Sequence, residues 1–185
     1  MPEDDATGER DAWGCVVGRF QPFHRDHCSL VEEVVAASGR VIVAVTNVEA
    51  SWRVPVREAP HRHEEAANPF TYGQRVELIE AALAPFVPRE QFRVTPFPIH
   101  DPTQWGEYLP PGTECWVRDR GPWEQRKIRD LGMHYPVRVA SPLDVEVSGT
   151  EIRRRLRAGD ESWTADVPEP VAELIRRWRC DGTFQ

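Results

Sequence analysis

Residues 13–45 read WGCVVGRFQPFHRDHCSLVEEVVAASGRVIVAV, and this stretch decides the fold. Its first residues, 13–17, form a short apolar run that ends at Gly18, which is typical of a buried strand. A loop with a proline follows, and then a helical pattern that stops at Gly39. The apolar face of that helix contains Leu30, Val31, Val34 and Val35. VIVAV at 41–45 is a second strand, so the stretch predicts a βαβ unit with parallel strands and a right-handed crossover.

Strand and helix patterns continue to alternate along the rest of the chain. The predicted strands are 92–97, 115–117 and 137–139, and the predicted helices are 71–83, 120–132, 148–156 and 170–178. Residues 51–68 contain Pro, His and Glu without a clear period, which predicts a long mobile loop. Residues 1–11 are expected to be a flexible N-terminal tail, and 12–185 one domain. The alternation predicts a Rossmann-like α/β fold with a doubly wound parallel sheet, and such sheets bind ligands at the carboxyl ends of their strands.

Composition restricts the classes of function. The 185 residues suit one domain, and a hydrophobic fraction of 40% is enough for a packed core. The net charge of -7 argues against a nucleic-acid-binding protein, although a few well-placed arginines can still bind a small polyanion. No apolar run is long enough for a membrane span, and the acidic start MPEDDATGER is no signal peptide. A cytoplasmic protein is therefore expected, and the sequence leaves open whether it forms a homo-oligomer.

The cysteines give no sign of a metal or redox site. None of them lies in a C-x-x-C pair, and the one in the first strand is expected to be a small core residue. They are Cys15, Cys28, Cys115 and Cys180.

The loop after the first strand has the residues of a phosphate site. Residues 18–27 read GRFQPFHRDH, which places one arginine and two histidines between a strand end and a helix N-terminus. A helix N-terminus offers free N–H groups and a partial positive charge, which suits a triphosphate. His24 and His27 are three residues apart, so both can donate hydrogen bonds to phosphate oxygens. The alternative is that they are ordinary surface histidines on a loop.

A second candidate polyanion site lies at residues 148–155, SGTEIRRR. Hydroxyl and N–H groups at a helix start, followed by arginines, can bind the departing phosphates. Of the three arginines, Arg153 is the one expected to do so. The alternative is that the motif is ordinary helix capping followed by a solvated charged face.

Together, GRFQPFHxxH at 18–27, NPFTxGxR at 68–75 and SGTEIRRRL at 148–156 resemble the archaeal-type nicotinamide mononucleotide adenylyltransferases of the HxGH superfamily. The resemblance extends to DVPEPVAELI at 166–175. It implies binding of the phosphates of an NTP with Mg²⁺. The nucleotide-binding residues implied are Gly18, Arg19, Phe20, Gln21, His24, His27, Ser148, Gly149, Thr150 and Arg153, with catalytic roles for Arg19, His24, His27 and Arg153. Because Mg²⁺ keeps several waters and bridges phosphates, we expect no dedicated metal-binding residues.

The sequence departs from that family at the HxGH glycine, which is Asp26 here. One interpretation is that Asp26 caps the helix and points away from the nucleotide. The other is that it contacts a metal or changes the pose of the nucleotide.

The acceptor side diverges further. Trp105 stands where the family has a stacking tryptophan, but Pro102 replaces the asparagine that reads nicotinamide. Residues 117–127, VRDRGPWEQRK, replace an S-G-N-P stretch, and residues 142–147 lack the usual aromatic and basic character. The acceptor-binding residues expected are Trp105, Arg118, Arg120, Arg126 and Lys127, although some of these cations would line a polar helix instead.

These departures favour one reaction among three. The leading hypothesis is transfer of a nucleoside monophosphate, from CTP rather than ATP, to a small phosphonate or phosphate such as phosphonoformate, as in diverged relatives that serve phosphonate natural-product pathways. The second is a nicotinamide mononucleotide adenylyltransferase that uses ATP. The third is a nucleotide-binding regulatory domain without turnover.

Overall fold

The computed structural model describes residues 12–182, so the predicted tail at 1–11 lies outside the described residues. The strands are β1 (Gly14–Gly18), β2 (Val41–Val45), β3 (Phe92–Pro96), β4 (Glu114–Val117) and β5 (Val137–Val139). The α-helices are α1 (Arg25–Ser38), α2 (Tyr72–Leu83), α3 (Pro122–Gly132), α4 (Gly149–Ala158) and α5 (Glu169–Cys180). The 3₁₀ segments are η1 (Ala50–Trp52), η2 (Glu65–Ala67), η3 (Arg89–Gln91), η4 (Pro102–Glu107) and η5 (Glu161–Asp166).

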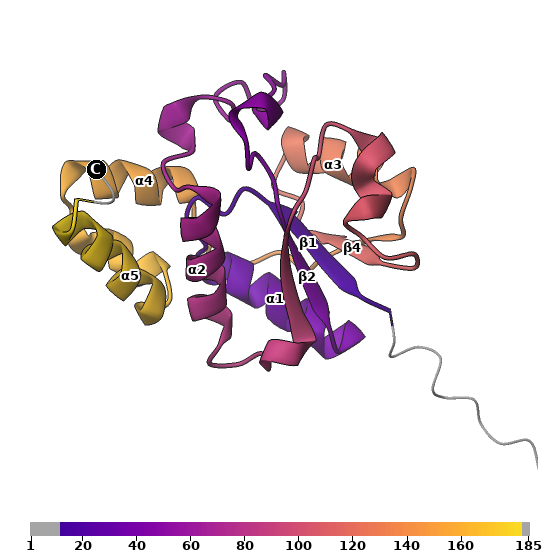
Figure 1. Cartoon of the computed structure of the whole chain (residues 1–185), viewed down its shortest axis with the longest axis horizontal. Coiled ribbons are helices and arrows are strands. Elements are labelled where there is room, and N and C mark those ends of the chain that lie inside the picture. Colours follow the sequence, from indigo (N-terminus) through magenta and orange to yellow (C-terminus); the bar gives the residue numbers. More distant parts are fainter. Residues whose placement is uncertain (1–11, 183–185) are drawn as a thin grey trace, which may run out of the picture.

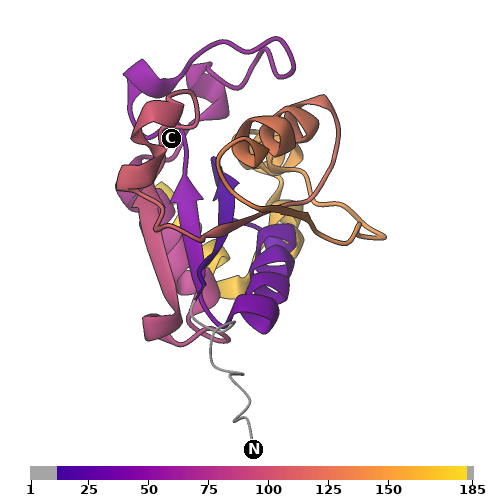
Figure 2. The same cartoon turned by 90° about the vertical axis from the view of Figure 1, so that its right-hand side faces the viewer.

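The strands form one parallel sheet in the order β3-β2-β1-β4-β5. The chain builds the sheet outward from β1 in one direction and then in the other, so the order reverses between β1 and β4. This is the predicted Rossmann-like, doubly wound arrangement, and the prediction is confirmed. Figure 2 shows the strands running toward the end of the molecule where the purple segment between β2 and α2 lies.

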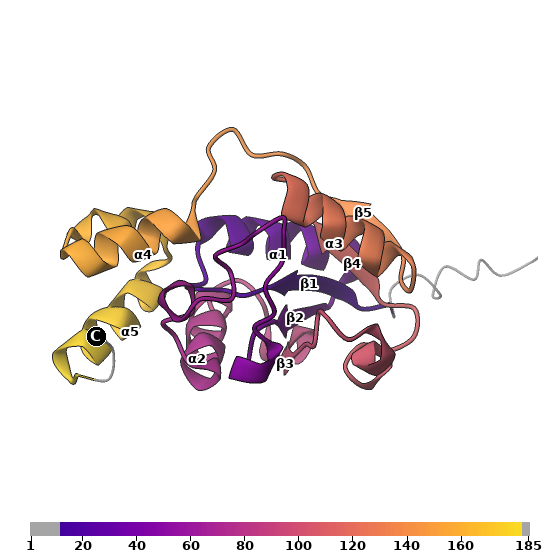
Figure 3. The same ribbon diagram turned by 90° about the horizontal axis from the view of Figure 1, so that it is seen from above.

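Apolar side chains cover both faces of the sheet. One core cluster joins Val16, Val43 and Val45 to buried residues of α1, α2, α4 and α5. The other joins Cys15 and Ile42 to residues of η4 and α3. Figures 1 and 3 show α4 and α5 lying together at one side of the sheet, next to α2.

The start of β1 illustrates how closely these layers pack. A Cβ atom at Gly14 would lie 2.1 Å from Cγ1 of Val34, so a larger residue would push α1 away from the sheet. Since α1 begins directly after the first βα loop, this close contact also fixes the position of the loop that carries His24 and His27.

The segment predicted to be a long mobile loop has defined contacts. It contains η2 and the last two residues of η1, and its carbonyl groups accept hydrogen bonds from side chains of Arg19, Asn47 and Asn68. In the described part of the chain, no helix is long and apolar enough to cross a membrane.

Candidate active site

A cavity lies at the carboxyl ends of β1 and β4, where the strand order reverses. Its volume is about 420 Å³, and it is lined by the first βα loop, the N-termini of α1 and α4, and the β4–α3 loop. Crevices at such a reversal are the usual ligand sites of open α/β sheets. All ten residues of the predicted nucleotide-binding set line it: Gly18, Arg19, Phe20, Gln21, His24, His27, Ser148, Gly149, Thr150 and Arg153.

The two histidines lie against each other at the start of α1. His24 is the N-cap residue, and its ring stacks on that of His27 with centroids 3.6 Å apart. The backbone N–H of His24 donates to Nδ1 of His27 at 3.2 Å. A neutral imidazole carries one ring proton, so this contact leaves the proton of His27 on Nε2. Nε2 is therefore a hydrogen-bond donor.

Burial keeps both rings neutral. Together with the positive charges of Arg120 and Arg153, it lowers the pKa of His24 from 6.5 to about 3. Burial also lowers the pKa of His27 well below 6.5, and His24, Arg120, Lys127 and Arg118 act in the same direction. A bound polyanion would oppose this effect, because negative charge favours the protonated ring.

Two other residues of the first βα loop hold the backbone in place. The Gln21 side chain exchanges two hydrogen bonds of 2.9 Å with the backbone of Phe70, donating to its carbonyl and accepting from its N–H. Phe20 is buried, and its ring meets that of His27 edge-on at 4.9 Å.

Arg75, from the NPFTxGxR motif, is 1% exposed and donates to the carbonyls of Arg19, Thr46 and Asn47. This motif therefore has a structural role beside the pocket.

The start of α4 faces the start of α1. Ser148 is the N-cap and accepts from the N–H of Glu151 at 3.4 Å. Arg153 is 5% exposed and donates to the carbonyl of Gln21 at 2.7 Å and to Oγ1 of Thr150 at 3.1 Å. A Cβ atom at Gly149 would lie 3.5 Å from the carbonyl oxygen of Gln21 and 3.8 Å from Cδ2 of His24, which shows how close the start of α4 comes to the first βα loop and the start of α1.

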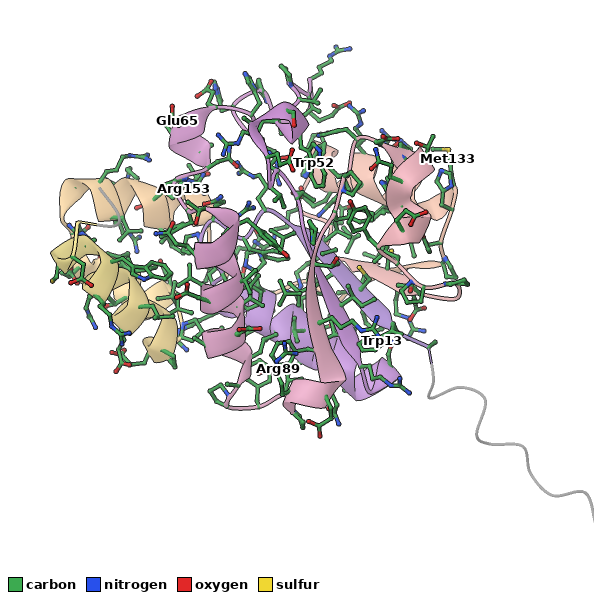
Figure 4. All side chains as sticks on the ribbon, in the orientation of Figure 1. Trp13, Trp52, Glu65, Arg89, Met133 and Arg153 are labelled. Atoms are coloured by element: carbon green, nitrogen blue, oxygen red, sulfur yellow. The ribbon has the colours of Figure 1, made fainter. Side chains whose placement is uncertain are left out.

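The three consecutive arginines of α4 differ in their surroundings. Arg154 and Arg155 both form ion pairs with Glu151, and neither lines the cavity. Figure 4 shows Arg153 beside the segment that carries Glu65, and α4 contacts this segment where Arg157 donates to the carbonyl of Ala66 at 3.2 Å.

Asp26, at the HxGH glycine position, lines the cavity and is 5% exposed. Its Oδ2 accepts from the N–H of Val147 at 2.7 Å and forms an ion pair with Arg120. Arg120 also donates to the carbonyl of Val147 at 3.1 Å, so the backbone N–H and the backbone carbonyl of Val147 are both hydrogen-bonded. Because Val147 precedes Ser148, Asp26 ties the N-terminus of α1 to that of α4. Asp26 therefore does not point away from the cavity, as one interpretation expected, and the other, a metal contact or a changed nucleotide pose, stays a hypothesis.

The predicted acceptor residues separate into three groups. Arg118, Arg120 and Lys127 line the cavity, whereas Trp105 and Arg126 do not. Trp105 is 1% exposed, and its indole N–H donates to the carbonyl of Pro98 at 2.9 Å, so it is a core residue. Arg126 forms ion pairs with Glu58 and Asp130. The sequence prediction could not distinguish these cations, because pairing partners come from distant segments.

The cations that do line the cavity have partners as well. Arg118 is buried, donates to the carbonyls of Ser141 and Asp26 at 2.7 and 3.0 Å, and forms an ion pair with Glu33. Lys127 donates to the carbonyl of Val17 at 3.0 Å, and burial lowers its pKa to about 8.

Sequence reasoning missed Arg62 and Glu124, which also line the cavity. Arg62 comes from the segment between β2 and α2, which has no periodic pattern and gave no signal. Glu124 lies in the first turn of α3.

Within residues 12–182, no group of three or more His, Cys, Asp or Glu side chains could hold a metal ion.

A doubly wound parallel sheet with an arginine-rich cavity at its strand-order reversal, faced by two helix N-termini, is typical of nucleotide-binding α/β proteins. A family model for cytidylyltransferase-like proteins matches residues 15–155. The chain belongs to the cytidylyltransferase-like family, and it is an enzyme, a nucleotidyltransferase.

Individual relatives carry two different names. The phosphonoformate cytidylyltransferase of Streptomyces viridochromogenes is 29% identical over 175 residues, covering 91% of this chain and 92% of its own. The nicotinamide-nucleotide adenylyltransferase of Pyrococcus abyssi is 30% identical over 166 residues, covering 88% and 82%.

Solved structures share the fold at lower identity. A bifunctional NMN adenylyltransferase/ADP ribose pyrophosphatase from Francisella tularensis, complexed with AMP and a manganese ion, has a TM-score of 0.63 and 15% identity over 91% of this chain, which spans about half (49%) of that one. A putative nicotinate-nucleotide adenylyltransferase from Vibrio parahaemolyticus has a TM-score of 0.58 and 14% identity, covering 89% and 99%.

Proposed function

We propose that this nucleotidyltransferase transfers CMP from CTP to a small phosphonate or phosphate such as phosphonoformate and releases pyrophosphate. The observation that carries the choice of acceptor is Trp105. This tryptophan is 1% exposed and its N–H is bonded to Pro98, so it offers no free face to a nicotinamide ring. The similarity to a phosphonoformate cytidylyltransferase along nearly the whole chain supports the same choice.

In this proposal the triphosphate lies between the N-termini of α1 and α4. Nε2–H of His27 and the guanidinium of Arg153 donate to phosphate oxygens, and both helix N-termini favour the negative charge. An oxygen of the acceptor dianion attacks the α-phosphorus in line with the leaving group. The new P–O bond forms as the bond to the bridging oxygen of the β-phosphate breaks, and its electron pair leaves with pyrophosphate. The acceptor oxygen is already anionic, so no general base is needed.

Mg²⁺ would reach the site bound to the phosphates of the NTP. The carboxylates that line the cavity are Asp26, Glu124 and Glu146, and Asp26 is already paired with Arg120. This set suits an ion that keeps most of its ligands from phosphate and water. The ion would neutralise charge on the phosphates, and Glu124 and Glu146 are the carboxylates at the cavity that could bind its waters.

The direct test is identification of the product. Purified protein is incubated with CTP, phosphonoformate and MgCl₂, and the mixture is analysed by mass spectrometry and ³¹P NMR. The proposal expects a mixed anhydride of CMP and phosphonoformate together with one equivalent of pyrophosphate. Pyrophosphate without the anhydride would mean hydrolysis of CTP and would contradict the proposal.

A second candidate is nicotinamide mononucleotide adenylyl transfer, which the Pyrococcus relative performs by name. One feature of this chain favours it. A second cavity of about 230 Å³ lies at the ends of β2 and β3, lined by Asn47, Trp52 and Gln104 among others, and could hold a flat amide-bearing ring. NAD formation from ATP and nicotinamide mononucleotide, measured in parallel, distinguishes the two reactions.

A further inference from the structure

Arg62 lies in the segment between β2 and α2 and reaches the cavity beneath it. Its guanidinium lies over the indole of Trp123, with Cζ 5.0 Å from the ring centroid. A guanidinium above an indole face is held by cation–π attraction while its N–H groups at the edge remain available. The side chain therefore has a fixed position without its hydrogen-bond donors being used.

The backbone of Arg62 is held equally firmly. Its carbonyl oxygen accepts from Nη1 of Arg19 at 3.1 Å, Nδ2 of Asn47 at 3.3 Å and Nδ2 of Asn68 at 2.9 Å. A carbonyl has two lone pairs, so three donors at one oxygen mark an unusually constrained position. Asn47 itself adopts a left-handed backbone with φ of 54°, which asparagine tolerates better than most residues.

Among the cations that line the cavity within residues 12–182, Arg62 is the one whose side chain forms neither an ion pair nor a hydrogen bond, whereas Arg19, Lys127 and Arg153 donate to backbone carbonyls. Arg118 and Arg120 are paired with carboxylates, whereas Arg62 forms no ion pair with any carboxylate of residues 12–182. Burial lowers its pKa to about 10, and Glu124 acts in the opposite direction, so the side chain is charged at neutral pH. A partly buried charge without a partner is unfavourable, and a bound anion would relieve that cost.

The location of Arg62 relative to the two cavities suits contact with a substrate that reacts at the triphosphate. The triphosphate site lies at the N-termini of α1 and α4, around His27 and Arg153. Trp123, which supports Arg62, has its ring centroid 6.0 Å from that of His100, and His100 lines the second cavity. Arg62 therefore lies between the second cavity and the triphosphate site, where Arg19 donates to its carbonyl and its charge lowers the pKa of Arg153.

We propose that Arg62 binds the phosphorus-centred dianion of the acceptor and holds its attacking oxygen toward the α-phosphorus of the NTP. This inference rests on the proposed nucleotidyl transfer, but it holds for either acceptor, because phosphonoformate and nicotinamide mononucleotide both present such a dianion. It further implies that Asn68 is a positioning residue, which acts by holding the backbone of Arg62.

Steady-state kinetics of Arg62→Gln and Arg62→Lys test the proposal, with Arg57→Ala as the matched control. Arg57 is an exposed arginine of the same segment and does not line the cavity. We expect Arg62→Gln to raise the acceptor KM about tenfold or more, as loss of a charged hydrogen bond does, and the CTP KM less than about threefold. Arg62→Lys should recover part of the loss, and Arg57→Ala should match the wild type. An unchanged acceptor KM in a folded Arg62→Gln, or equal rises in both KM values, would overturn the proposal.

A double-mutant cycle tests the positioning role of Asn68. Asn68→Ala should raise the acceptor KM in the wild-type background and have little further effect in the Arg62→Gln background. Additive effects would mean that Asn68 does not act through Arg62. The wild type is first assayed with both acceptors. Turnover of nicotinamide mononucleotide but not phosphonoformate contradicts the proposed function alone, and the Arg62 variants are then measured with the mononucleotide.

Discussion

At the scale of single residues, His27 shows how a backbone contact can set chemistry. Its Nδ1 accepts the N–H of His24, so the ring must present Nε2–H to the cavity, and burial keeps it neutral. A neutral donor of this kind can strengthen its hydrogen bond as charge develops on the phosphates, without first losing an ion pair.

Replacing His27 with alanine should therefore lower kcat about a hundredfold or more, as loss of one transition-state donor typically does. His134→Ala is the control, since His134 is exposed and its ring contacts Trp105 rather than the cavity. Turnover is measured by pyrophosphate release, and circular dichroism confirms folding. Wild-type turnover by a folded His27→Ala protein would remove this histidine from the mechanism.

His24 predicts a dependence of stability on pH. Its folded-state pKa of about 3 is below its unfolded value of 6.5, so protons bind the unfolded chain preferentially. The stabilisation is complete above pH 6.5 and is lost as the pH falls toward the folded-state pKa. Between pH 6.5 and about 5 this one group should cost about 2 kcal/mol.

Urea unfolding of wild type and His24→Gln at both pH values measures the effect. The variant should lose correspondingly less stability on acidification, because glutamine does not titrate. Identical losses in the two proteins would show that His24 is not buried in its neutral form.

The sequence identified the polar residues of the cavity better than their partners. His24, His27, Ser148, Thr150 and Arg153 follow local signals, namely helix starts after strand ends, and the fold brings them to one cavity. Trp105 and Arg126 were expected at the acceptor but face the core and the carboxylates of Glu58 and Asp130. Those contacts depend on distant segments, which one sequence does not reveal.

At the scale of elements, the start of α1 is joined to the start of α4 through Asp26. The carboxylate of Asp26 accepts a hydrogen bond from the N–H of Val147 and forms an ion pair with Arg120. The backbone carbonyl of Asp26 accepts a hydrogen bond from Arg118 at 3.0 Å. The two helix N-termini that face the cavity are thus fixed relative to each other by side chains, where the family pattern has a glycine.

Asp26→Asn should destabilise the protein by about 3 kcal/mol, since it leaves Arg120 partly buried without its counter-charge. Asp26→Asn with Arg120→Ala should lose less than the sum of the single changes, because the pair is removed together. Chemical unfolding provides the four free energies of this cycle. Strict additivity would contradict the coupling between the two side chains.

The first turns of α4 give a second prediction at this scale. Arg153→Ala should reduce kcat about a hundredfold, since its guanidinium lines the cavity. Arg154→Ala should stay within about twofold of the wild type, because exposed ion pairs such as that with Glu151 contribute little. Equal small effects at both positions would mean that the arginines form only a charged helix face.

Elements were predictable from the sequence wherever a period was present. The apolar runs of β1 and β2, the capping box of Thr71 and Gln74 and the glycine after α1 all appear in the structure near the predicted boundaries. The structure of segment 51–68 was not predictable from the sequence. Its 3₁₀ turns are fixed by hydrogen bonds of single side chains such as Asn68 rather than by a repeating pattern. Arg62 belongs to that segment and was missed for the same reason.

At the scale of the whole molecule, the order β3-β2-β1-β4-β5 explains why sites from both ends of the chain meet. The reversal beside β1 opens a cavity to which α4 returns after the sheet is complete, so residues 18–27 and 148–153 share one pocket. The sequence predicted the doubly wound parallel sheet, because its strands and helices alternate and crossovers are right-handed, but it did not specify the strand order. For the substrates, the leading hypothesis from the sequence was CTP with a small phosphonate and the second was nicotinamide mononucleotide with ATP, and this choice depends on the remaining walls of the cavity.

The most direct test of the central claim is a comparison of kcat/KM for phosphonoformate and nicotinamide mononucleotide, each with CTP and with ATP, followed by pyrophosphate release. We predict the highest value for phosphonoformate with CTP, because the buried Trp105 offers no free face to a nicotinamide ring. A value for nicotinamide mononucleotide with ATP that is about tenfold higher or more, equivalent to about 1.4 kcal/mol of transition-state stabilisation, would contradict the account.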